Sequence, residues 1–301
     1  MKKLSGYNRA ITGMKRIDLH IHSTASDGTL SPAQIFKLAQ KLELKAISIT
    51  DHDTIDGSKE ALQTGIPSSV KFLTGVEISA SSPPSTSLAG SFHILGYSIR
   101  LDDPQLNKTL ALLQQARKNR NPQIVKRLNS MGFDFSLKNV ASEIGNGQLG
   151  RPHIARYMVK MGFVKSIDEA FKKYLAQGKP AYVDKYRVEC ERAIEVILDA
   201  GGIPVLAHPI LLNLDKKQTT GLFAQLKEMG IKGVEVYYPE HSPDMIAFYS
   251  ELAKSNGLLK TGGTDFHGSL KPDIQMGSGR GDFFVPYDIY EKLVRNLNGR
   301  S

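Results

Sequence analysis

The stretch Ile17-Asp18-Leu19-His20-Ile21-His22 decides how this chain is interpreted. Polar and apolar residues alternate in it as they do in a β-strand, where residues two apart point to the same face. The two histidines can therefore aim at one point beyond the strand while Leu19 and Ile21 pack behind them. Ser26-Asp27-Gly28 follows and adds a carboxylate to the same region. This stretch predicts a strand that ends in a group of metal-ligating side chains.

Histidines and acids recur at the ends of other predicted strands. They occur in Thr50-Asp51-His52-Asp53, Gly75-Val76-Glu77, His93-Ile94-Leu95-Gly96, Ala207-His208-Pro209 and Gly263-Thr264-Asp265-Phe266-His267-Gly268. A single His-x-His pair often arises by chance. Coincidence does not explain that pair together with Asp265-x-His267 and the other strand-end motifs. Imidazoles and carboxylates that converge from several strand ends hold divalent cations side by side. The sequence thus predicts a multinuclear metal hydrolase.

Short apolar segments alternate with amphipathic helical patterns, which is typical of an α/β protein. We expect strands over residues 17–21, 46–50, 70–78, 92–99, 203–207, 233–238 and 258–261. Residues 103–185 show only helical patterns, with a helix break expected at Asn121-Pro122. The expected organisation is a barrel formed by residues 1–102 and 186–301, with a helical insertion over 103–185 that caps the substrate.

The composition is that of an ordinary globular protein, with 301 residues, 41% hydrophobic and 23% charged. Cys190 is the single cysteine, so we expect no disulfides and a cytoplasmic location. No apolar run approaches the ~20 residues of a membrane span, and no apolar stretch follows the basic start as in a signal peptide. The net charge of +9 suggests an anionic partner or substrate, although a solvated lysine-rich surface is an equal alternative. The oligomeric state is not visible in the sequence.

The strand-end motifs closely resemble those of the PHP (polymerase and histidinol phosphatase) phosphoesterases, from about Ile17 to Gly268. Gly150-Arg151-Pro152-His153-Ile154-Ala155 and the helical insertion look like the branch of bacterial 3′,5′-nucleoside bisphosphate phosphatases and 5′-to-3′ oligoribonucleotide-trimming enzymes. The resemblance implies a distorted (β/α)7 barrel, in which functional groups gather at the C-terminal ends of the strands.

The resemblance also implies a trinuclear metal site. By motif, the first metal would be held by His20, His22, Glu77 and Asp265, the second by Glu77, His93 and His208, and the third by Asp27, His52 and His267. Asp27 stands where some relatives have a histidine, which favours manganese, with iron and zinc also open. Asp51, His208 and His267 are the candidate catalytic residues. Asp18, Asp51 and Asp53 flank the ligands and are expected to orient them rather than to bind metal, with direct proton transfer as an alternative for Asp51.

The expected chemistry is attack of a metal-activated hydroxide on a phosphomonoester of a nucleotide. A second anion site is expected from Arg117, Arg120, Arg151 and His153, since guanidinium forks and helix N-termini suit phosphate oxygens. Taken alone, Arg117 and Lys118 could equally belong to a solvated basic helix. The expected substrate is a nucleoside 3′,5′-bisphosphate, cleaved at the 3′-phosphate, or the 5′ end of a short RNA. The candidates for base stacking are Tyr157, Tyr182, Tyr186 and Tyr237, although each could equally be a core or a surface residue, whereas His241 is expected on the surface.

Four other activities remain open from the sequence. Histidinol phosphate phosphatase is one, although a small monophosphate needs no second phosphate pocket. A cyclic phosphodiester could be opened by the same metals. A zinc amidohydrolase would also begin with His-x-His, but the Thr-Asp-His-Asp motif and the late Asp-x-His fit phosphoesters better. A non-catalytic, metal-stabilised module like those attached to DNA polymerases is disfavoured because every ligand position is filled.

Overall fold

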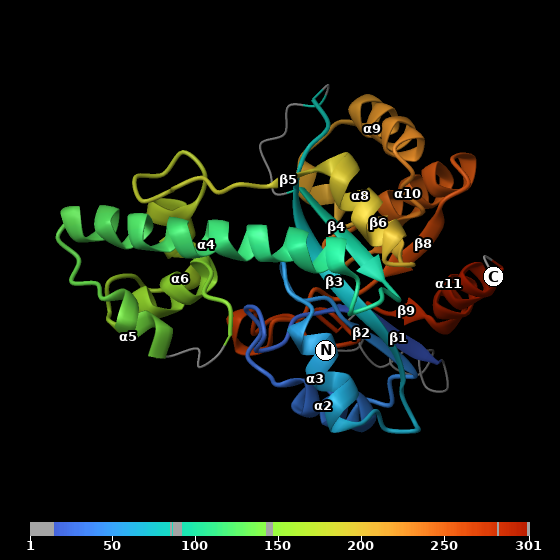
Figure 1. Ribbon diagram of the computed structural model, residues 1–301, viewed down its shortest axis with the longest axis horizontal. Helices are drawn as coiled ribbons and strands as arrows, with labels where there is room; N and C mark the ends of the chain where they lie inside the picture. The colour runs from blue at the N-terminus through green and yellow to red at the C-terminus, as the bar shows by residue number, and fades with distance from the viewer. Residues whose placement is uncertain (1–14, 85, 87–91, 143–146, 282, 300–301) are drawn as a thin grey trace, which may run out of the picture.

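The computed structural model describes residues 15–84, 86, 92–142, 147–281 and 283–299 (Figure 1). A mixed sheet of nine strands forms its centre. The strands are β1 (Arg16–Ile21), β2 (Ala46–Ile49), β3 (Lys71–Ser81), β4 (Phe92–Tyr97), β5 (Val188–Glu189), β6 (Ile203–Leu206), β7 (Gly233–Tyr237), β8 (Leu259–Gly262) and β9 (Val285–Pro286). They follow the order β8-β7-β6-β4-β3-β2-β1-β9, with β5 paired to β3. Phe266, just beyond β8, exchanges backbone hydrogen bonds with His20 and His22, which nearly closes the sheet into a barrel.

The seven expected strands are confirmed to within a few residues at each end, but the sheet is not uniformly parallel. β4 runs antiparallel to both β3 and β6. The physical reason is the short connection between β3 and β4, because a parallel pair needs a crossover of a dozen or more residues. The two-residue strands β5 and β9 were not expected, since segments so short carry no periodic signal.

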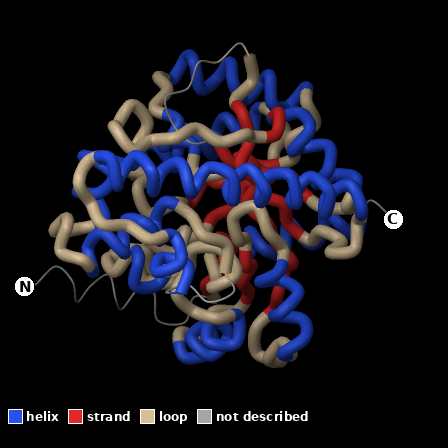
Figure 2. The backbone as a smooth tube through the Cα atoms, turned by 60° about the vertical axis from the view of Figure 1, so that its left-hand side comes forward, coloured by secondary structure: helices blue, strands red, loops and turns tan. Residues whose placement is uncertain are grey.

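Helices cover the outside of the sheet (Figures 1 and 2). They are α2 (Pro32–Lys41), α3 (Asp56–Thr64), α8 (Cys190–Asp199), α9 (Lys216–Glu228), α10 (Pro243–Ser255) and α11 (Tyr287–Asn298). Two short 3-10 helices, Pro209–Leu212 and Gly268–Leu270, begin directly after His208 and His267. None of the helices in the described part of the chain has the length and apolar character that a membrane span requires.

The segment expected to be helical projects from the sheet as a separate group of helices (Figure 1). It contains α4 (Pro104–Ser130), α5 (Leu137–Ser142), α6 (Arg151–Lys160) and α7 (Ile167–Ala170), and α7 continues into a π-helical turn over Phe171–Leu175. The predicted break at Asn121-Pro122 was wrong, because α4 runs through Pro122. Pro122 lies on the exposed face, where water can satisfy the carbonyl that loses its helical partner.

Helix α4 belongs to two hydrophobic cores. Leu106, Leu110 and Leu113 in its first half pack with β3, β4 and α8 in the core of the barrel. Ile124 and Leu128 in its second half pack with α6 and the π-helical turn in a core of their own. Burial of apolar side chains at both ends fixes the helix to both units. Residues near the middle of α4 therefore face the space between the barrel and the other helices of the insertion.

Candidate metal centre

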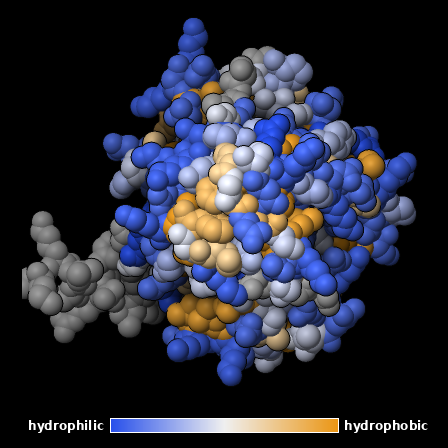
Figure 3. All heavy atoms as spheres, turned by 90° about the vertical axis from the view of Figure 1, so that its left-hand side faces the viewer, coloured by the Kyte–Doolittle hydropathy of each residue, from blue (hydrophilic) through white to orange (hydrophobic). Residues whose placement is uncertain are grey.

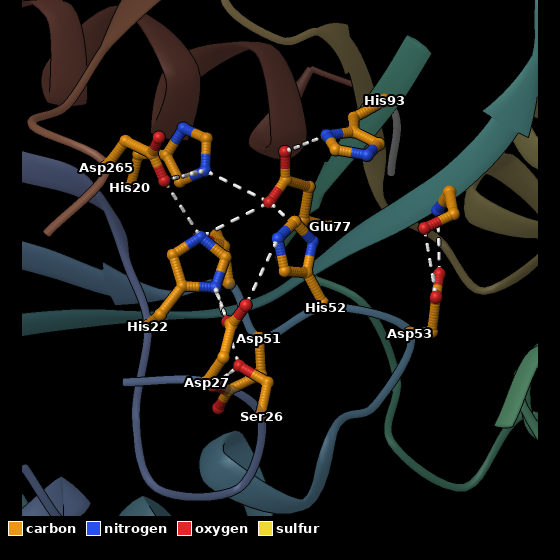
Figure 4. A network of polar contacts seen from close by, with 12 residues as sticks. His20, His22, Ser26, Asp27, Asp51, His52, Asp53, Glu77, His93 and Asp265 are labelled. Atoms are coloured by element: carbon orange, nitrogen blue, oxygen red, sulfur yellow. Dashed lines mark hydrogen bonds and ion pairs between the residues drawn. The ribbon is translucent and has the colours of Figure 1, made fainter. Parts of the chain in front are cut away.

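The predicted ligands converge at one end of the sheet, around Glu77 of β3 (Figure 4). His20 and His22, at the end of β1, are fully buried and point their Nε2 atoms toward the Glu77 carboxylate, at 3.3 and 3.2 Å from Oε2. Asp265, beyond β8, has Oδ1 3.1 Å from Nε2 of His22. Ligand atoms of these four residues all lie within 4.8 Å of one another. This cluster has the residue types and the spacing of a metal site.

Two further clusters share residues with the first. One contains His22, Asp27, His52 and His267, and the other contains His52, Glu77 and His93. His208 lies at the edge of the last, with Nε2 2.9 Å from Glu77 Oε1 and 3.3 Å from Nδ1 of His93. The structure therefore brings all nine predicted ligand residues together, with the two Glu77 oxygens facing different groups of histidines. Which residues hold which metal stays a prediction.

Several potential ligand atoms in the clusters have no hydrogen-bond partner among the described residues. His20 Nε2, His22 Nε2, Asp27 Oδ1, His52 Nδ1 and Glu77 Oε2 are buried and make no hydrogen bond of good geometry. Buried polar atoms are normally hydrogen-bonded, because leaving them unpaired costs free energy. A set of such atoms aimed at common points fits divalent cations, and imidazole with carboxylate suits manganese, iron or zinc.

Four of the predicted ligand residues have protonation states that suit metal binding, whereas the facing carboxylates raise the pKa of His20 and of His22 although burial opposes the shift. Burial lowers the pKa of His93 and of His267 to about 4, so both imidazoles are neutral near pH 7 and keep a free lone pair. Although burial opposes ionisation of Glu77 and Asp27, the surrounding histidines hold the pKa of both carboxyls well below the usual value. Neutral imidazoles and ionised carboxylates are the forms that bind metals.

Two acids that flank the predicted ligands, Asp51 and Asp18, hydrogen-bond to neighbouring loops. Asp51 accepts hydrogen bonds from Ser23 N at 2.7 Å, Ser23 Oγ at 2.6 Å and Ser26 Oγ at 2.5 Å. Asp18 accepts from the backbone of Thr264 and of Gly277, at 2.9 and 2.8 Å. Because the oxygens of both carboxylates are already engaged, their geometry favours orientation over a direct proton-transfer role, for Asp51 as well.

A basic hollow of about 120 Å³ opens beside the clusters. It is lined by Asp27, His52, Ser79, His93, Arg117, Arg120, Arg151, Pro152, Phe171, Lys185 and Arg187. Three predicted substrate-binding arginines thus meet there, joined by Lys185 and Arg187, which sequence reasoning missed. His153 does not line the hollow. Its Nδ1 accepts a hydrogen bond from Gly150 N at 2.9 Å, which favours a role in capping α6, the helix that begins with Arg151.

The cations of the hollow differ in how they are paired. Arg117 and Lys185 share Asp53, at 2.6 and 2.9 Å from its Oδ2. Arg120 contacts only the Asn121 side chain through its guanidinium, and Arg151 donates to the Leu175 carbonyl beside the Tyr182 ring. No carboxylate pairs with Arg120 or Arg151 among the described residues. Burial, with Arg117 and Arg151 close by, lowers the pKa of Arg120 to about 9. Excess buried positive charge of this kind favours binding of an anion.

Burial corrects the expectation for His241 and distinguishes two of the stacking candidates. His241 is buried rather than on the surface, with Nδ1 donating to the Val236 carbonyl at 2.8 Å. The turn after β7 folds back over the strand and places its ring between Tyr238 and Tyr249. Tyr157 lies in the core of the insertion, which removes it as a stacking candidate. Tyr182 is the candidate whose ring stands beside Arg151.

Sequence reasoning also missed Glu235, which contacts two of the predicted ligand residues from behind. A signal was present, since Glu235 is a lone acid inside the otherwise apolar strand Gly233–Tyr237. No such signal marks Lys185 and Arg187, because they lie in an irregular segment whose path depends on the tertiary structure.

Comparison with known proteins places the chain in a family. The model of the PHP domain matches residues 18–201, and the chain belongs to this family. It is a metal-dependent phosphoesterase, a hydrolase with a PHP-like fold. This makes the amidohydrolase and the non-catalytic alternatives the weaker interpretations of the sequence.

Individual relatives are similar over most of the chain. A 5′-3′ exoribonuclease of Haemophilus influenzae is 34% identical and a 3′,5′-nucleoside bisphosphate phosphatase of Chromobacterium violaceum 32%. Each alignment covers 84% of this chain, and 90% and 88% of the relatives. Among solved structures, a Bifidobacterium adolescentis chain described as a metal-dependent phosphoesterase gives a TM-score of 0.81 at 27% identity. The match covers 93% of this chain and 96% of the other. A Chromobacterium violaceum chain described as an amidohydrolase with bound sulfate gives 0.79 at 31%, covering 95% and 96%.

Proposed function

We propose that this phosphoesterase removes the 3′-phosphate from nucleoside 3′,5′-bisphosphates and trims the 5′ ends of short RNAs by the same chemistry. The observation that carries the proposal is the basic hollow beside the metal-ligand clusters. A substrate with phosphates at both ends of one nucleotide unit presents one phosphate to the clusters and the other to the hollow. The activities named for the bisphosphate phosphatase and exoribonuclease relatives agree with this substrate class.

The proposed cofactors are three divalent cations, with manganese first. His20, His22, Glu77 and Asp265 would hold one, Glu77, His93 and His208 a second, and Asp27, His52 and His267 the third. Bound cations of this kind lower the pKa of water and offset negative charge on phosphoryl oxygens. The neutral imidazoles of His93 and His267 supply lone pairs, and Glu77 offers one oxygen to each side. Asp51 keeps the loop that carries His22 and Asp27 in place.

The residues of the hollow would bind the second phosphate. Arg120 and Arg151 have no carboxylate partner in the described structure, so their guanidinium donors are available to phosphate oxygens in a bidentate manner. Asp53 holds Arg117 and Lys185 in fixed positions at the wall of the hollow. Fixed donors lose little conformational entropy on binding, which increases their selectivity for the phosphate.

The first experiment measures phosphate release from adenosine 3′,5′-bisphosphate by manganese-loaded protein, with a chelated sample alongside. Release that stops on chelation and resumes when Mn²⁺ is added is the expected result. Histidinol phosphate and a ribose cyclic phosphate are assayed in parallel. Faster turnover of either compound would replace the proposed substrate while leaving the phosphoesterase class intact.

A variant of the hollow tests how the second phosphate is recognised. Arg151→Ala is expected to lower kcat/KM for adenosine 3′,5′-bisphosphate by about 10- to 100-fold, the equivalent of ~1.5–3 kcal/mol for a charge-assisted hydrogen-bonded contact. Turnover of adenosine 3′-monophosphate, which lacks the second phosphate, should change little. Lys118→Ala, an exposed basic residue of α4, is the matched control. Equal losses on both substrates would remove the hollow from the proposal.

A further inference from the structure

Glu235 is a buried acid directly behind the metal-ligand clusters. It lies in β7 and has no exposed surface. Its Oε1 is 3.0 Å from Nδ1 of His20, and its Oε2 accepts a hydrogen bond from the backbone N of His208 at 2.7 Å. No lysine or arginine pairs with it in the described part of the chain. Burying a carboxylate costs free energy unless the carboxylate is hydrogen-bonded. These two hydrogen bonds offset that cost for Glu235.

The contact with His20 determines which nitrogen of that imidazole carries the proton. A carboxylate oxygen accepts hydrogen bonds, so Nδ1 of His20 is the donor in this contact. The lone pair of a neutral ring then lies on Nε2. That atom faces Glu77 Oε2 at 3.3 Å and Asp265 Oδ1 at 3.5 Å and has no hydrogen-bond partner of its own. Glu235 thereby presents the Nε2 lone pair of His20 to the cluster.

The contact with His208 fixes a turn of the backbone. His208 adopts φ 25° and ψ 64° between β6 and the 3-10 helix that follows. A positive φ is uncommon for a residue with a side chain and persists only where its surroundings hold it. The turn carries the His208 ring to Glu77, with Nε2 2.9 Å from Oε1. One carboxylate therefore supports imidazoles on both sides of Glu77.

We propose that Glu235 is a positioning residue of the metal centre, which sets the tautomer of His20 and the backbone turn of His208. The inference rests on the proposed ligand roles of these two histidines. Asp18, Asp51 and Asp53 differ from it, because their hydrogen bonds are with backbone, hydroxyl or cationic groups rather than with a ligand imidazole. Carboxylates that hydrogen-bond a metal-ligating histidine typically contribute about 10- to 100-fold to metal affinity.

The test is Glu235→Gln in the full chain. Glutamine has one acceptor oxygen, so either His20 or His208 faces an amide donor instead of an acceptor. Calorimetric titration of chelator-stripped protein with Mn²⁺ should show affinity weakened by about 10- to 100-fold. In metal-free protein, ¹⁵N NMR of labelled histidine should show Nδ1 of His20 protonated and hydrogen-bonded in the wild type, and the chemical shift of that nitrogen should change in the variant. Phosphatase turnover should recover substantially at saturating Mn²⁺.

Glu240→Gln is the matched control, since Glu240 follows the same strand but its side chain is 43% exposed. It should leave Mn²⁺ affinity and the His20 tautomer unchanged. Should Glu235→Gln not fold, Glu235→Asp keeps the charge but withdraws it by one methylene, and weaker Mn²⁺ binding by this variant is expected. Unchanged Mn²⁺ affinity with an unchanged His20 tautomer, in whichever variant folds, would overturn the inference.

His20→Ala separates this inference from the proposed ligand set. If His20→Ala weakens Mn²⁺ binding while the Glu235 variant does not, only the positioning role of Glu235 fails. If neither change affects Mn²⁺ binding, the proposed ligand role of His20 fails first, and the inference fails with it.

Discussion

Asp27 and Asp51 lie in different motifs and differ in the donors that surround them. Asp27 has an Oδ1 atom that is buried without a hydrogen bond, whereas both oxygens of Asp51 are taken by Ser23 and Ser26. The resemblance implies a ligand role for Asp27 and a catalytic or orienting role for Asp51, but no local pattern gives a physical reason for the difference. The contacts agree with that difference, because serine donors reach Asp51 and not Asp27, which depends on how two loops meet.

Lys185 should make binding of the second phosphate sensitive to pH. Burial, together with the adjacent Arg117, lowers the pKa of Lys185 to about 7, while Asp53 opposes the shift. The side chain is therefore charged below pH 7 in the free enzyme and loses its charge as the pH rises through 7. We expect KM for adenosine 3′,5′-bisphosphate to rise between pH 6 and pH 8.5 at saturating Mn²⁺.

Lys185→Arg supplies the comparison for this pH profile, because guanidinium stays charged over the whole range. The rise in KM should flatten in this variant. A slope as steep as that of the wild type would assign the pH dependence to another group. Adenosine 3′-monophosphate should show a smaller slope than the bisphosphate with either protein.

Among the helices and strands, α4 is destabilised by Pro122 in its interior. Proline has no N–H to donate to the carbonyl four residues earlier, and its ring crowds the preceding turn. Pro122 is exposed and contributes nothing to either core. Pro122→Ala should raise the free energy of unfolding by about 1–2 kcal/mol, less than the full ~3 kcal/mol helix-propensity difference because the unfolded chain gains entropy.

Urea unfolding followed by circular dichroism would measure the effect of Pro122→Ala. Gln123→Ala, at the next exposed position, is the control and should shift the midpoint little. A destabilised Pro122→Ala protein would mean that α4 needs the proline to hold its path between the two cores.

The longer strands and the helices could largely be predicted from the sequence, because most have a clear period or cap. Ser166, for example, precedes Glu169 by three residues, the spacing of a capping box, and accepts a hydrogen bond from Glu169 N at the start of α7. The direction of β4 could not be predicted, since alternation identifies a strand but not its neighbour. The nine clustered ligand residues could be predicted because motifs at strand ends meet wherever the strands pack into one sheet. Lys185, Arg187 and Glu235 reach the site through tertiary contacts that no local pattern records.

At the scale of the whole molecule, the charge is distributed unevenly. Residues 103–185 contain 15 Lys and Arg against 6 Asp and Glu, a net charge of +9. The remaining 24 Lys and Arg (39 less 15) are balanced by the remaining 24 Asp and Glu (30 less 6). Hydrophilic side chains surround a central apolar area on the face at the insertion end of the molecule (Figure 3). The insertion therefore carries the whole excess of positive charge, beside a neutral barrel.

This distribution should steer anionic substrates toward the site. Long-range attraction is screened by salt, with a Debye length of about 10 Å at 0.1 M. We expect kcat/KM for adenosine 3′,5′-bisphosphate to fall several-fold between 30 and 300 mM added salt (about 18 to 6 Å in Debye length). Steady-state assays over a salt series would measure this.

Charge-reversal variants test whether the salt dependence of kcat/KM comes from the insertion. Lys126→Glu with Lys138→Glu, both exposed on the insertion, should lower kcat/KM at low salt and flatten its salt dependence. Lys37→Glu with Lys41→Glu changes the net charge equally on α2 of the barrel and should have less effect. Equal effects of the two pairs would show that total charge, rather than its location, governs association.

Because α4 is anchored in one core at each end, the number of residues between its anchors sets the distance between the two cores along the helix. Arg117 and Arg120 lie between Leu113, in the barrel core, and Ile124, in the core of the insertion. Each residue added between Leu113 and Arg117 would rotate both arginines by about 100° and advance them by about 1.5 Å. Seven added residues would return them close to the same face about 10.5 Å further along the helix axis. If the site binds one phosphate at the metal-ligand clusters and the other at the hollow, lengthening α4 by two turns would increase the span between the two phosphates that it accepts.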